Sequence, residues 1–343
     1  MIKDAIIRAA SRQNLSYETT AGVIDAIMSG KATDIQTAAF LTAMAMKGES
    51  IEEITAAAAA MRKHCVRILH DKDVLEIVGT GGDGSNSFNI STTSSLVIAA
   101  AGVPVAKHGN RAASSKCGAA DVLEALGVDI TVPGDVSLRL LNEIGICFLF
   151  AQNYHIAMKY VAPVRREIGI RTIFNILGPL VNPAGANMEL LGVYDGDMVE
   201  PMARVLNNLG VKNALVVFGR DGLDEISVSD KTSVCEVKNG AFRSYAIDPR
   251  DYGFALCKKS ELTGGDPAEN AAITRAVLRG EKSAKRDAVL LNSAAAIYLA
   301  GGAPDIGAGI KIAEKLIDGG AAEEKLAKFV ALSNEYGKAA KTV

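Results

Sequence analysis

Residues 74–92 read VLEIVGTGGDGSNSFNIST, in which a short apolar strand leads into a glycine-rich turn and then into an apolar helix. The glycines let backbone N–H groups approach an anion closely, and the start of the following helix adds a favourable dipole. Ser91 and Thr92 are common helix-capping residues whose hydroxyls can also bind an oxygen ligand. A simple structural turn is the alternative, but it does not require so many glycines. The segment therefore predicts an anion-binding loop between a strand and a helix.

The same glycines also fit a second pattern, because Gly79, Gly81 and Gly84 satisfy GxGxxG, the fingerprint of dinucleotide-binding folds. In those folds the helix opens within the glycines, and an acidic residue after the second strand holds the ribose. Here the helix is expected to start near Ser91, and the second strand ends in a lysine and a histidine. Both features argue against a nicotinamide cofactor.

Downstream of this loop, short β-branched runs alternate with helical segments and glycine turns. The alternation is typical of βαβ units and predicts an α/β fold with a mostly parallel central sheet. The expected later elements are strands at 190–194 and 215–218, a helical stretch at 154–177, a hairpin at 232–247 and helices from Pro267 on. The hairpin is expected to turn at Asn239-Gly240, a pair that favours a tight primed turn.

The N-terminal part of the chain reads as helices only. Thr33 with Gln36 and Ser50 with Glu53 have the spacing of capping boxes, each of which opens a helix. The alanine-rich run 56–60 is a helix interior that is expected to pack closely against another helix. The expected organisation is a small all-helical domain over 1–66, with a later contribution from about 154–180, and a larger α/β domain over 70–343.

Composition excludes several classes of protein. The formal net charge of −2 and the pI near 6.2 argue against a protein that binds nucleic acid or anionic membranes. The five cysteines are odd in number and form no CxxC pair, which fits a reducing compartment. The charged N-terminus is unlike a signal peptide, and no apolar run is long enough for a membrane span. These observations predict a cytoplasmic protein.

A basic loop follows the second strand, within VPVAKHGNRAASSKCGAADVLEALG at 103–127. Its polar and basic residues are Lys107, Asn110, Arg111, Ser114, Ser115 and Lys116. Ligands of parallel sheets collect at the carboxyl ends of the strands, where the glycine loop also lies. Two such loops side by side could hold both ends of one polyphosphorylated molecule. His108 is interpreted as structural rather than as a catalytic base, because a lone histidine more often is.

An acidic pair lies within DGLDEIS at 221–227, where Asp224 and Glu225 are adjacent and follow an expected strand. Neighbouring carboxylates repel each other unless a cation offsets their charge. Magnesium is a reasonable partner, because it needs only one or two carboxylates when the substrate supplies phosphate oxygens. Such a pair alone is usually a surface feature; together with the two loops it predicts a Mg²⁺ site.

Four segments of the chain resemble motifs of the anthranilate phosphoribosyltransferase family. These segments are GTGGDGSNSFNIST (79–92), KHGNRAASSKCGAADVLEALG (107–127), APVRREIGIRTIFNILGPLVNPA (162–184) and DGLDEIS (221–227). The resemblance covers nearly the whole chain. It implies a Mg²⁺-dependent pentosyltransferase that joins 5-phosphoribosyl 1-pyrophosphate to the amine of anthranilate and releases pyrophosphate, the second step of tryptophan biosynthesis from chorismate. It also implies a fold of the nucleoside phosphorylase/phosphoribosyltransferase type, usually a homodimer through its helical part. The sugar phosphate would lie at the strand ends and anthranilate between the domains.

The resemblance also implies sets of binding residues at matching positions. Those for phosphoribosyl pyrophosphate are Gly79, Gly82, Asp83, Ser87, Asn89, Ile90, Ser91, Thr92, Lys107, His108, Gly109, Asn110, Arg111, Ala112, Ala113, Ser114, Ser115 and Ala119. Those for anthranilate are Gly79, Asn110 and Arg165, and those for Mg²⁺ are Ser91, Asp224 and Glu225. Ser87 stands where the family often has threonine, a change that keeps the hydroxyl. Catalysis is expected to be electrostatic and positional, with no residue assigned a catalytic proton transfer.

Two other functions remain to be distinguished. A pyrimidine nucleoside phosphorylase shares this architecture but uses inorganic phosphate and a nucleoside, and the KHGNRAASSKCG and DGLDE segments argue against it. A relative that has lost the transferase activity could bind nucleic acid through a basic surface. The slightly negative net charge of the chain and the intact Asp224-Glu225 pair argue against that function.

Overall fold

The computed structural model describes residues 1–112 and 115–341. Its centre is a seven-stranded sheet in the order β3-β2-β1-β4-β5-β6-β7. The strands are β1 (Leu75–Gly79), β2 (Val105–Gly109), β3 (Ile146–Phe150), β4 (Met188–Gly192), β5 (Asn213–Gly219), β6 (Thr232–Lys238) and β7 (Ala241–Ile247). Strands β1 to β5 run parallel to one another, whereas β6 is antiparallel to both β5 and β7. The predicted fold class, an α/β chain with a mostly parallel sheet and a helical N-terminal domain, is confirmed.

The order of the strands creates a switch point between β1 and β4. The chain runs outward from β1 through β2 to β3 and then returns to place β4 on the other side of β1. Connections from β1 and from β4 therefore leave the sheet in opposite directions, and a crevice opens at the carboxyl ends of these two strands. The two strands end in register, with Gly79 opposite Gly192.

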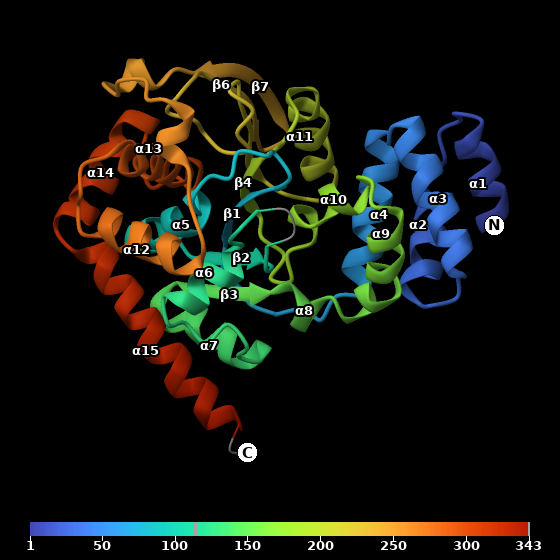
Figure 1. Ribbon diagram of the computed structural model, residues 1–343, viewed down its shortest axis with the longest axis horizontal. Helices are drawn as coiled ribbons and strands as arrows, with labels where there is room; N and C mark the ends of the chain where they lie inside the picture. The colour runs from blue at the N-terminus through green and yellow to red at the C-terminus, as the bar shows by residue number, and fades with distance from the viewer. Residues whose placement is uncertain (113–114, 342–343) are drawn as a thin grey trace.

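Helices cover both faces of the sheet, so the strands are buried on both sides. Successive residues of β4 and β5 belong to different cores: Leu190 and Leu215 pack with the C-terminal helices, whereas Leu191 and Val216 pack with the helical domain. The helices of the first core are α5 (Ile90–Ala100), α6 (Ala119–Ala125), α7 (Gly134–Ile144), α12 (Pro267–Leu278), α13 (Ala284–Leu299), α14 (Ile306–Asp318) and α15 (Ala321–Lys341). Figure 1 shows α12 to α15 and the helical domain at opposite ends of the molecule.

The helical domain consists of four N-terminal helices, and the N-terminus lies at its far edge (Figure 1). They are α1 (Ile2–Ala10), α2 (Tyr17–Met28), α3 (Asp34–Lys47) and α4 (Ile51–Lys63). Both predicted capping boxes are confirmed, at Thr33 for α3 and at Ser50 for α4. The predicted close packing of the alanine run is also confirmed, since most of it is buried and α4 contacts both α2 and α11 (Val199–Asn208).

The helical stretch predicted at 154–177 is broken into short pieces. These are α8 (Ala151–Tyr154), the 3₁₀ helix η1 (Ile156–Tyr160), α9 (Ala162–Ile168) and α10 (Phe174–Leu177), followed by the 3₁₀ helix η2 (Pro179–Val181). A left-handed Gly169 ends α9, a conformation that terminates helices. Helix α9 packs against α3, so the predicted segment belongs spatially with the N-terminal helices (Figure 1).

Two local predictions were wrong in detail. The strand predicted at 190–194 begins two residues earlier and ends at Gly192. Ser91 and Thr92 do not cap α5: its N-cap is Asn89, and no side-chain cap hydrogen bond forms there.

The hairpin at 232–247 is confirmed, with positive φ at both Asn239 and Gly240. In the described part of the chain, no helix combines the length and the apolar character that crossing a membrane requires.

Candidate active site

The candidate site lies at the switch point, where the ends of β1 and β4 carry glycines because Asp224 lies directly against them. A Cβ added at Gly192 would lie 1.7 Å from the main-chain oxygen of Asp224, and one added at Gly79 would lie 2.3 Å from its Oδ2. Real Cβ atoms do not approach other atoms this closely, so only glycine fits at both strand ends. The acidic pair therefore lies at the crevice between the two strands.

The glycine loop wraps around the same carboxylate. The backbone N–H of Gly81 donates to Asp224 Oδ2 at 2.7 Å, and the N–H of Asp224 donates to Asp83 Oδ2 at 3.3 Å. Gly81, Gly82 and Gly84 all have positive φ, which glycine adopts without strain. No described residue accepts a hydrogen bond from the N–H groups of Gly82, Asp83 or Gly84. These donors form a concave backbone surface of the kind that binds anions.

The start of α5 completes one wall of the site. The backbone N–H of Ser91 donates to Glu225 Oε1 at 3.1 Å, which ties this helix to the acidic pair. Lys107, in the middle of β2, is buried, and its Nζ donates to Ile77 O at 2.7 Å and to Ser91 Oγ at 3.3 Å. An ammonium group has three donors, so one remains for a ligand. The predicted anion-binding loop, the Lys107 ammonium and the predicted acidic pair therefore lie next to one another.

The acidic pair is buried, and its negative charge is not balanced by an adjacent ion pair. Burial raises the pKa of Asp224 well above its ordinary value, and the nearby Asp83 and Glu225 carboxylates raise it further. Burial also raises the pKa of Glu225 to about 7, against the opposing effect of Lys107. Glu225 Oε2 is buried without a hydrogen-bond partner. This set of hard oxygen donors with a spare buried lone pair fits a divalent cation such as Mg²⁺.

The protein alone does not surround such a cation. No group of three or more His, Cys, Asp and Glu side chains among the described residues is arranged to hold a metal ion. Magnesium commonly keeps several waters and takes its other ligands from substrate phosphates. The arrangement therefore fits a metal that binds together with a phosphorylated ligand.

The basic loop after β2 is described only in part, since Ala113 and Ser114 lie outside the described residues. Its arginine is already paired: Arg111 Nη1 lies 2.9 Å from Asp121 and 2.8 Å from Glu124, both on α6. Asp121 Oδ2 also accepts the N–H of Ala112. The loop is therefore fastened to the start of α6, and its backbone, rather than the Arg111 side chain, is left for a ligand.

Other residues of the two loops divide into exposed and buried groups. Asn110 is exposed and accepts from the N–H of Arg111, and Ser115 is also exposed. Ala119 begins α6 and faces Gly109, whose added Cβ would lie 3.0 Å from the Ala119 Cβ. In contrast, Ile90 and Thr92 are buried, so only their backbone is available for a ligand.

Asn89 and Ser87 connect the glycine loop to its surroundings. Asn89 donates to Cys117 O at 3.2 Å and accepts from Asn270 at 2.8 Å, so it links both predicted loops to α12. Ser87 forms an isolated bridge with Thr263. Both residues lie within the predicted loop, and their contacts fix its shape.

His108 points away from this group. Alternation along β2 places it on the opposite face from Lys107, where its ring centroid lies 5.0 Å from that of His155. Burial and the neighbouring His155 lower the pKa of His108 to about 3, so the ring is neutral. Its backbone N–H donates to Glu76, a buried carboxylate on β1. The interpretation of His108 as a structural residue fits this environment.

Arg165 lies on α9, the part of the broken helical stretch that packs on α3. Its guanidinium is half-buried, and its Cζ lies 5.7 Å from the centroid of the Phe174 ring. Burial lowers the pKa of Arg165, and no described residue forms an ion pair with it. A half-buried, unpaired guanidinium presents the planar fork that binds a carboxylate. No hydrogen bond joins Arg165 to Asn110 or to the glycine loop within the described chain.

Several residues of the site were missed by the sequence reasoning. Gly192 and Asn270 give no local chemical signal, because their importance depends on contacts with Asp224 and Asn89. Arg171 donates to the carbonyl oxygen of Gly82, and its Cζ lies 4.2 Å from the ring centroid of Tyr194. Arg171 lies within the third family motif, but its partner is distant in the sequence.

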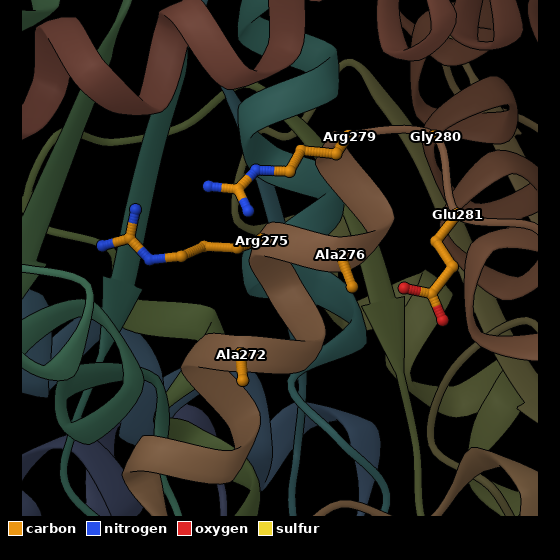
Figure 2. Close-up of a pocket in the computed structure, with 6 residues that line it drawn as sticks. All are labelled: Ala272, Arg275, Ala276, Arg279, Gly280 and Glu281. Carbon is orange, nitrogen blue, oxygen red and sulfur yellow. The ribbon is translucent and has the colours of Figure 1, made fainter.

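A second hollow on the surface is a weaker candidate. It is lined by Arg275, Arg279 and Glu281 at the C-terminal end of α12, and Figure 2 shows both guanidinium groups on one side of the helix. Arg275 donates to Leu126 O, and Arg279 pairs with Glu323. The C-terminal end of a helix also disfavours anions. Both arginine side chains already have protein partners, so this hollow is not the functional site.

Family models match the helical domain and the α/β domain of this chain separately. Residues 3–65 match the helical bundle domain of a glycosyl transferase family, and residues 71–323 match its α/β domain. The anthranilate phosphoribosyltransferase of Methanobrevibacter smithii is 61% identical over 334 residues, which are 97% of this chain and all of that protein.

Solved structures agree with the sequence comparison. The crystal structure of the Thermus thermophilus anthranilate phosphoribosyltransferase superposes with a TM-score of 0.91 at 43% identity, over 96% of this chain and 99% of that chain. The Saccharomyces cerevisiae enzyme in complex with PRPP and Mg superposes with a TM-score of 0.90 at 29% identity, over 97% and 98% of the two chains.

Replacing Gly192 by alanine tests the close approach at the switch point. The substitution is expected to lower the free energy of unfolding by about 1–3 kcal/mol, the usual cost of overpacking, because its Cβ meets main-chain atoms. The midpoint of urea unfolding measures this loss.

Gly134→Ala is the matched control. A Cβ there would lie 3.7 Å from its nearest neighbour, an ordinary van der Waals contact, and the stability is expected to stay within about 0.5 kcal/mol of wild type. A Gly192→Ala protein as stable as the control would contradict the described geometry.

Proposed function

Because the chain belongs to the anthranilate phosphoribosyltransferases, a family of glycosyl transferases, we propose that the crevice between β1 and β4 is its active site. The enzyme transfers the phosphoribosyl group of 5-phosphoribosyl 1-pyrophosphate to the amine of anthranilate and releases pyrophosphate. This reaction is the second step of tryptophan biosynthesis. We assign the site to this crevice because the glycine loop, Lys107 and the buried acidic pair lie together at the switch point.

The donor substrate would bind along both loops. The free N–H groups of Gly82, Asp83 and Gly84 would donate hydrogen bonds to phosphate oxygens, and the dipole of α5 favours the same negative charge. The proposed donor set is Gly79, Gly82, Asp83, Ser87, Asn89 to Thr92, Lys107 to Ser115 and Ala119. Within it, the Lys107 ammonium would supply positive charge, whereas His108, Ile90 and Thr92 would contribute backbone groups.

Ser91, Asp224 and Glu225 are the residues that would hold Mg²⁺. Glu225 Oε2 supports this assignment because it is buried and has no partner. When bound, magnesium would neutralise negative charge that grows on the pyrophosphate group. The yeast relative was solved in complex with PRPP and Mg.

The acceptor would bind on the side of the helical domain. Arg165 is proposed to pair with the carboxylate of anthranilate, because its guanidinium is half-buried and has no ion pair among the described residues. Asn110 and Gly79 are proposed to line the same position from the sheet side. Binding the carboxylate away from the reacting carbon would leave the ortho amine facing the ribose.

The reaction then requires positioning and charge stabilisation. The bond from ribose C1 to the pyrophosphate oxygen breaks with both electrons leaving on that oxygen, while the amine nitrogen bonds to C1 and later loses a proton. Loop N–H groups and Lys107 would stabilise the developing negative charge. An aromatic amine is unprotonated at neutral pH, so Arg165 would act by orienting the acceptor rather than by activating it.

A homodimer through the helical domain is the proposed assembly. Ile35 and Met46 lie eleven residues apart on α3, about three helical turns, and so share one face. Their exposures are 82% and 74%, and Ile7 on the neighbouring α1 is 64% exposed. A cluster of this kind on two packed helices fits a second copy of the chain.

The proposed compartment is the cytoplasm. All five cysteines are free thiols, and three of them are buried. A reducing compartment keeps such thiols in this form.

Asp224→Asn tests the proposed metal site. The substitution removes one negative charge and is expected to lower kcat/KM by at least about 100-fold, the range seen when one electrostatic contact is lost. The decay of anthranilate fluorescence with phosphoribosyl pyrophosphate, at several Mg²⁺ concentrations, measures the rate. Asp195→Asn, an exposed aspartate after β4, is the control and is expected to retain wild-type activity. Full activity of Asp224→Asn without Mg²⁺ would contradict the assignment.

Arg165→Gln tests the acceptor position. The variant is expected to raise KM for anthranilate about 10-fold or more and to leave KM for the donor nearly unchanged, since a hydrogen bond to a charged group contributes about 1.5–3 kcal/mol. Arg166→Gln removes an exposed arginine from the same helix and serves as the control. An equal rise in both KM values for Arg165→Gln would point instead to a general loss of structure.

Lysine substitutions at Ile7 and Ile35 test the assembly. The double variant is expected to be monomeric at micromolar concentration, because buried lysines at an interface lack partners. Sedimentation velocity measures the mass. Leu69→Lys, at a side chain 74% exposed outside the helices, is expected to remain a dimer like the wild type. A wild-type protein that sediments as a monomer would overturn the proposed dimer.

A further inference from the structure

We propose that Arg171 is a positioning residue that couples the two substrate sites, so that binding of the donor strengthens binding of the acceptor. The inference rests on the proposed function, because it takes the glycine loop as the donor site and Arg165 as the acceptor site. Arg171 belongs to neither set of binding residues.

Arg171 bridges two separate parts of the site. Its Nη2 donates to the carbonyl oxygen of Gly82, in the middle of the glycine loop. The face of its guanidinium lies over Tyr194, just after β4, with 4.2 Å between Cζ and the ring centroid. The planar guanidinium can stack and donate at the same time, which an ammonium group cannot. Tyr194 thus holds Arg171 in the orientation that the hydrogen bond needs.

The hydrogen bond determines where the next backbone donor points. A trans peptide is planar, so the C=O of Gly82 and the N–H of Asp83 point in opposite directions. Holding the oxygen toward Arg171 therefore directs the Asp83 N–H away from it. No described residue accepts a hydrogen bond from this N–H. Arg171 thus keeps one donor of the glycine loop aimed at the place where the phosphates would bind.

The other end of the bridge is the unit that carries Arg165. Gly169 ends α9 and donates its N–H to the carbonyl oxygen of Arg165 at 3.2 Å. Thr172 accepts and donates hydrogen bonds with Asn175, which fixes the turn directly after Arg171. Phe174 lies below the Arg165 guanidinium. Arg165 and Arg171 are therefore held on one short, hydrogen-bonded segment.

A hydrogen bond that joins a loop to a second segment couples the binding free energies of two ligands when each ligand orders one of the two. A donor that orders the glycine loop fixes Gly82, and through Arg171 it also fixes the segment that presents Arg165. Linkage requires the same factor in both directions, so the acceptor must strengthen donor binding equally. An arginine with only a structural role on the surface would leave this factor unchanged when it is removed.

Calorimetric binding of 2-methylbenzoate tests the coupling, because this compound keeps the ring and carboxylate of the acceptor but has no nucleophile. Its Kd is measured with and without saturating phosphoribosyl pyrophosphate and Mg²⁺. The wild-type ratio is expected to be about fivefold or more, and Arg171→Ala is expected to bring it to about one. Arg171→Lys is expected to give an intermediate ratio, and Tyr194→Phe, which keeps the aromatic face, the wild-type ratio.

Arg166→Ala removes an exposed charge from the same segment and is expected to leave the ratio at its wild-type value. Failure of the wild type to consume anthranilate in the fluorescence assay would refute the proposed function itself. A wild type that transfers the phosphoribosyl group but shows no coupling would overturn the role of Arg171 alone. Unchanged coupling in Arg171→Ala would overturn it as well.

Discussion

The close approach of Asp224 to two glycines is the contact on which the rest of the site depends. Gly79 and Gly192 end neighbouring parallel strands in register, and neither can carry a side chain because Asp224 lies against both. The same carboxylate accepts the N–H of Gly81 and so shapes the anion loop. One backbone constraint thus places a carboxylate, a loop of free N–H groups and the crevice of the sheet together. The absence of side chains at the strand ends is what makes room for the chemistry.

The acidic side chains of the crevice, Asp224 and Glu225, are buried next to each other. Burial raises the pKa of Asp224, and the nearby Asp83 and Glu225 carboxylates raise it further, whereas the buried Lys107 opposes the rise at Glu225. A metal ion with a pyrophosphate would add charges of both signs in the same place. A divalent cation at the proposed metal site would offset the repulsion between these carboxylates, which their burial makes costly.

Much of the fold was predictable because its signals are local. The capping boxes at Thr33 and Ser50, the turn at Asn239-Gly240 and the glycine-rich loop each depend on residues close in sequence. The strand alternation also predicted the mostly parallel sheet. The sequence alone did not identify Gly192, nor the contact of Arg171 with Gly82, because both depend on segments that meet only in the folded chain. The cap of α5 was mispredicted for a related reason: Ser91 uses its backbone to bind Glu225, so the chain enters the helix at Asn89 instead.

Strand β2 contributes side chains both to the proposed donor site and to the segment that leads to the proposed acceptor residue, Arg165. Lys107 faces α5 and the donor loop, whereas His108 faces His155, on the segment that leads to α9. Below them, Glu76 accepts from the His108 N–H and from Asn182, which follows η2. One strand therefore contributes a cation to one region and a neutral polar contact to the other. Because successive residues of a strand point to opposite faces, a shift of the whole β2 register by one residue would remove both contacts at once. The pleat of the sheet thus places the glycine loop and the segment that leads to α9 on opposite faces of β2.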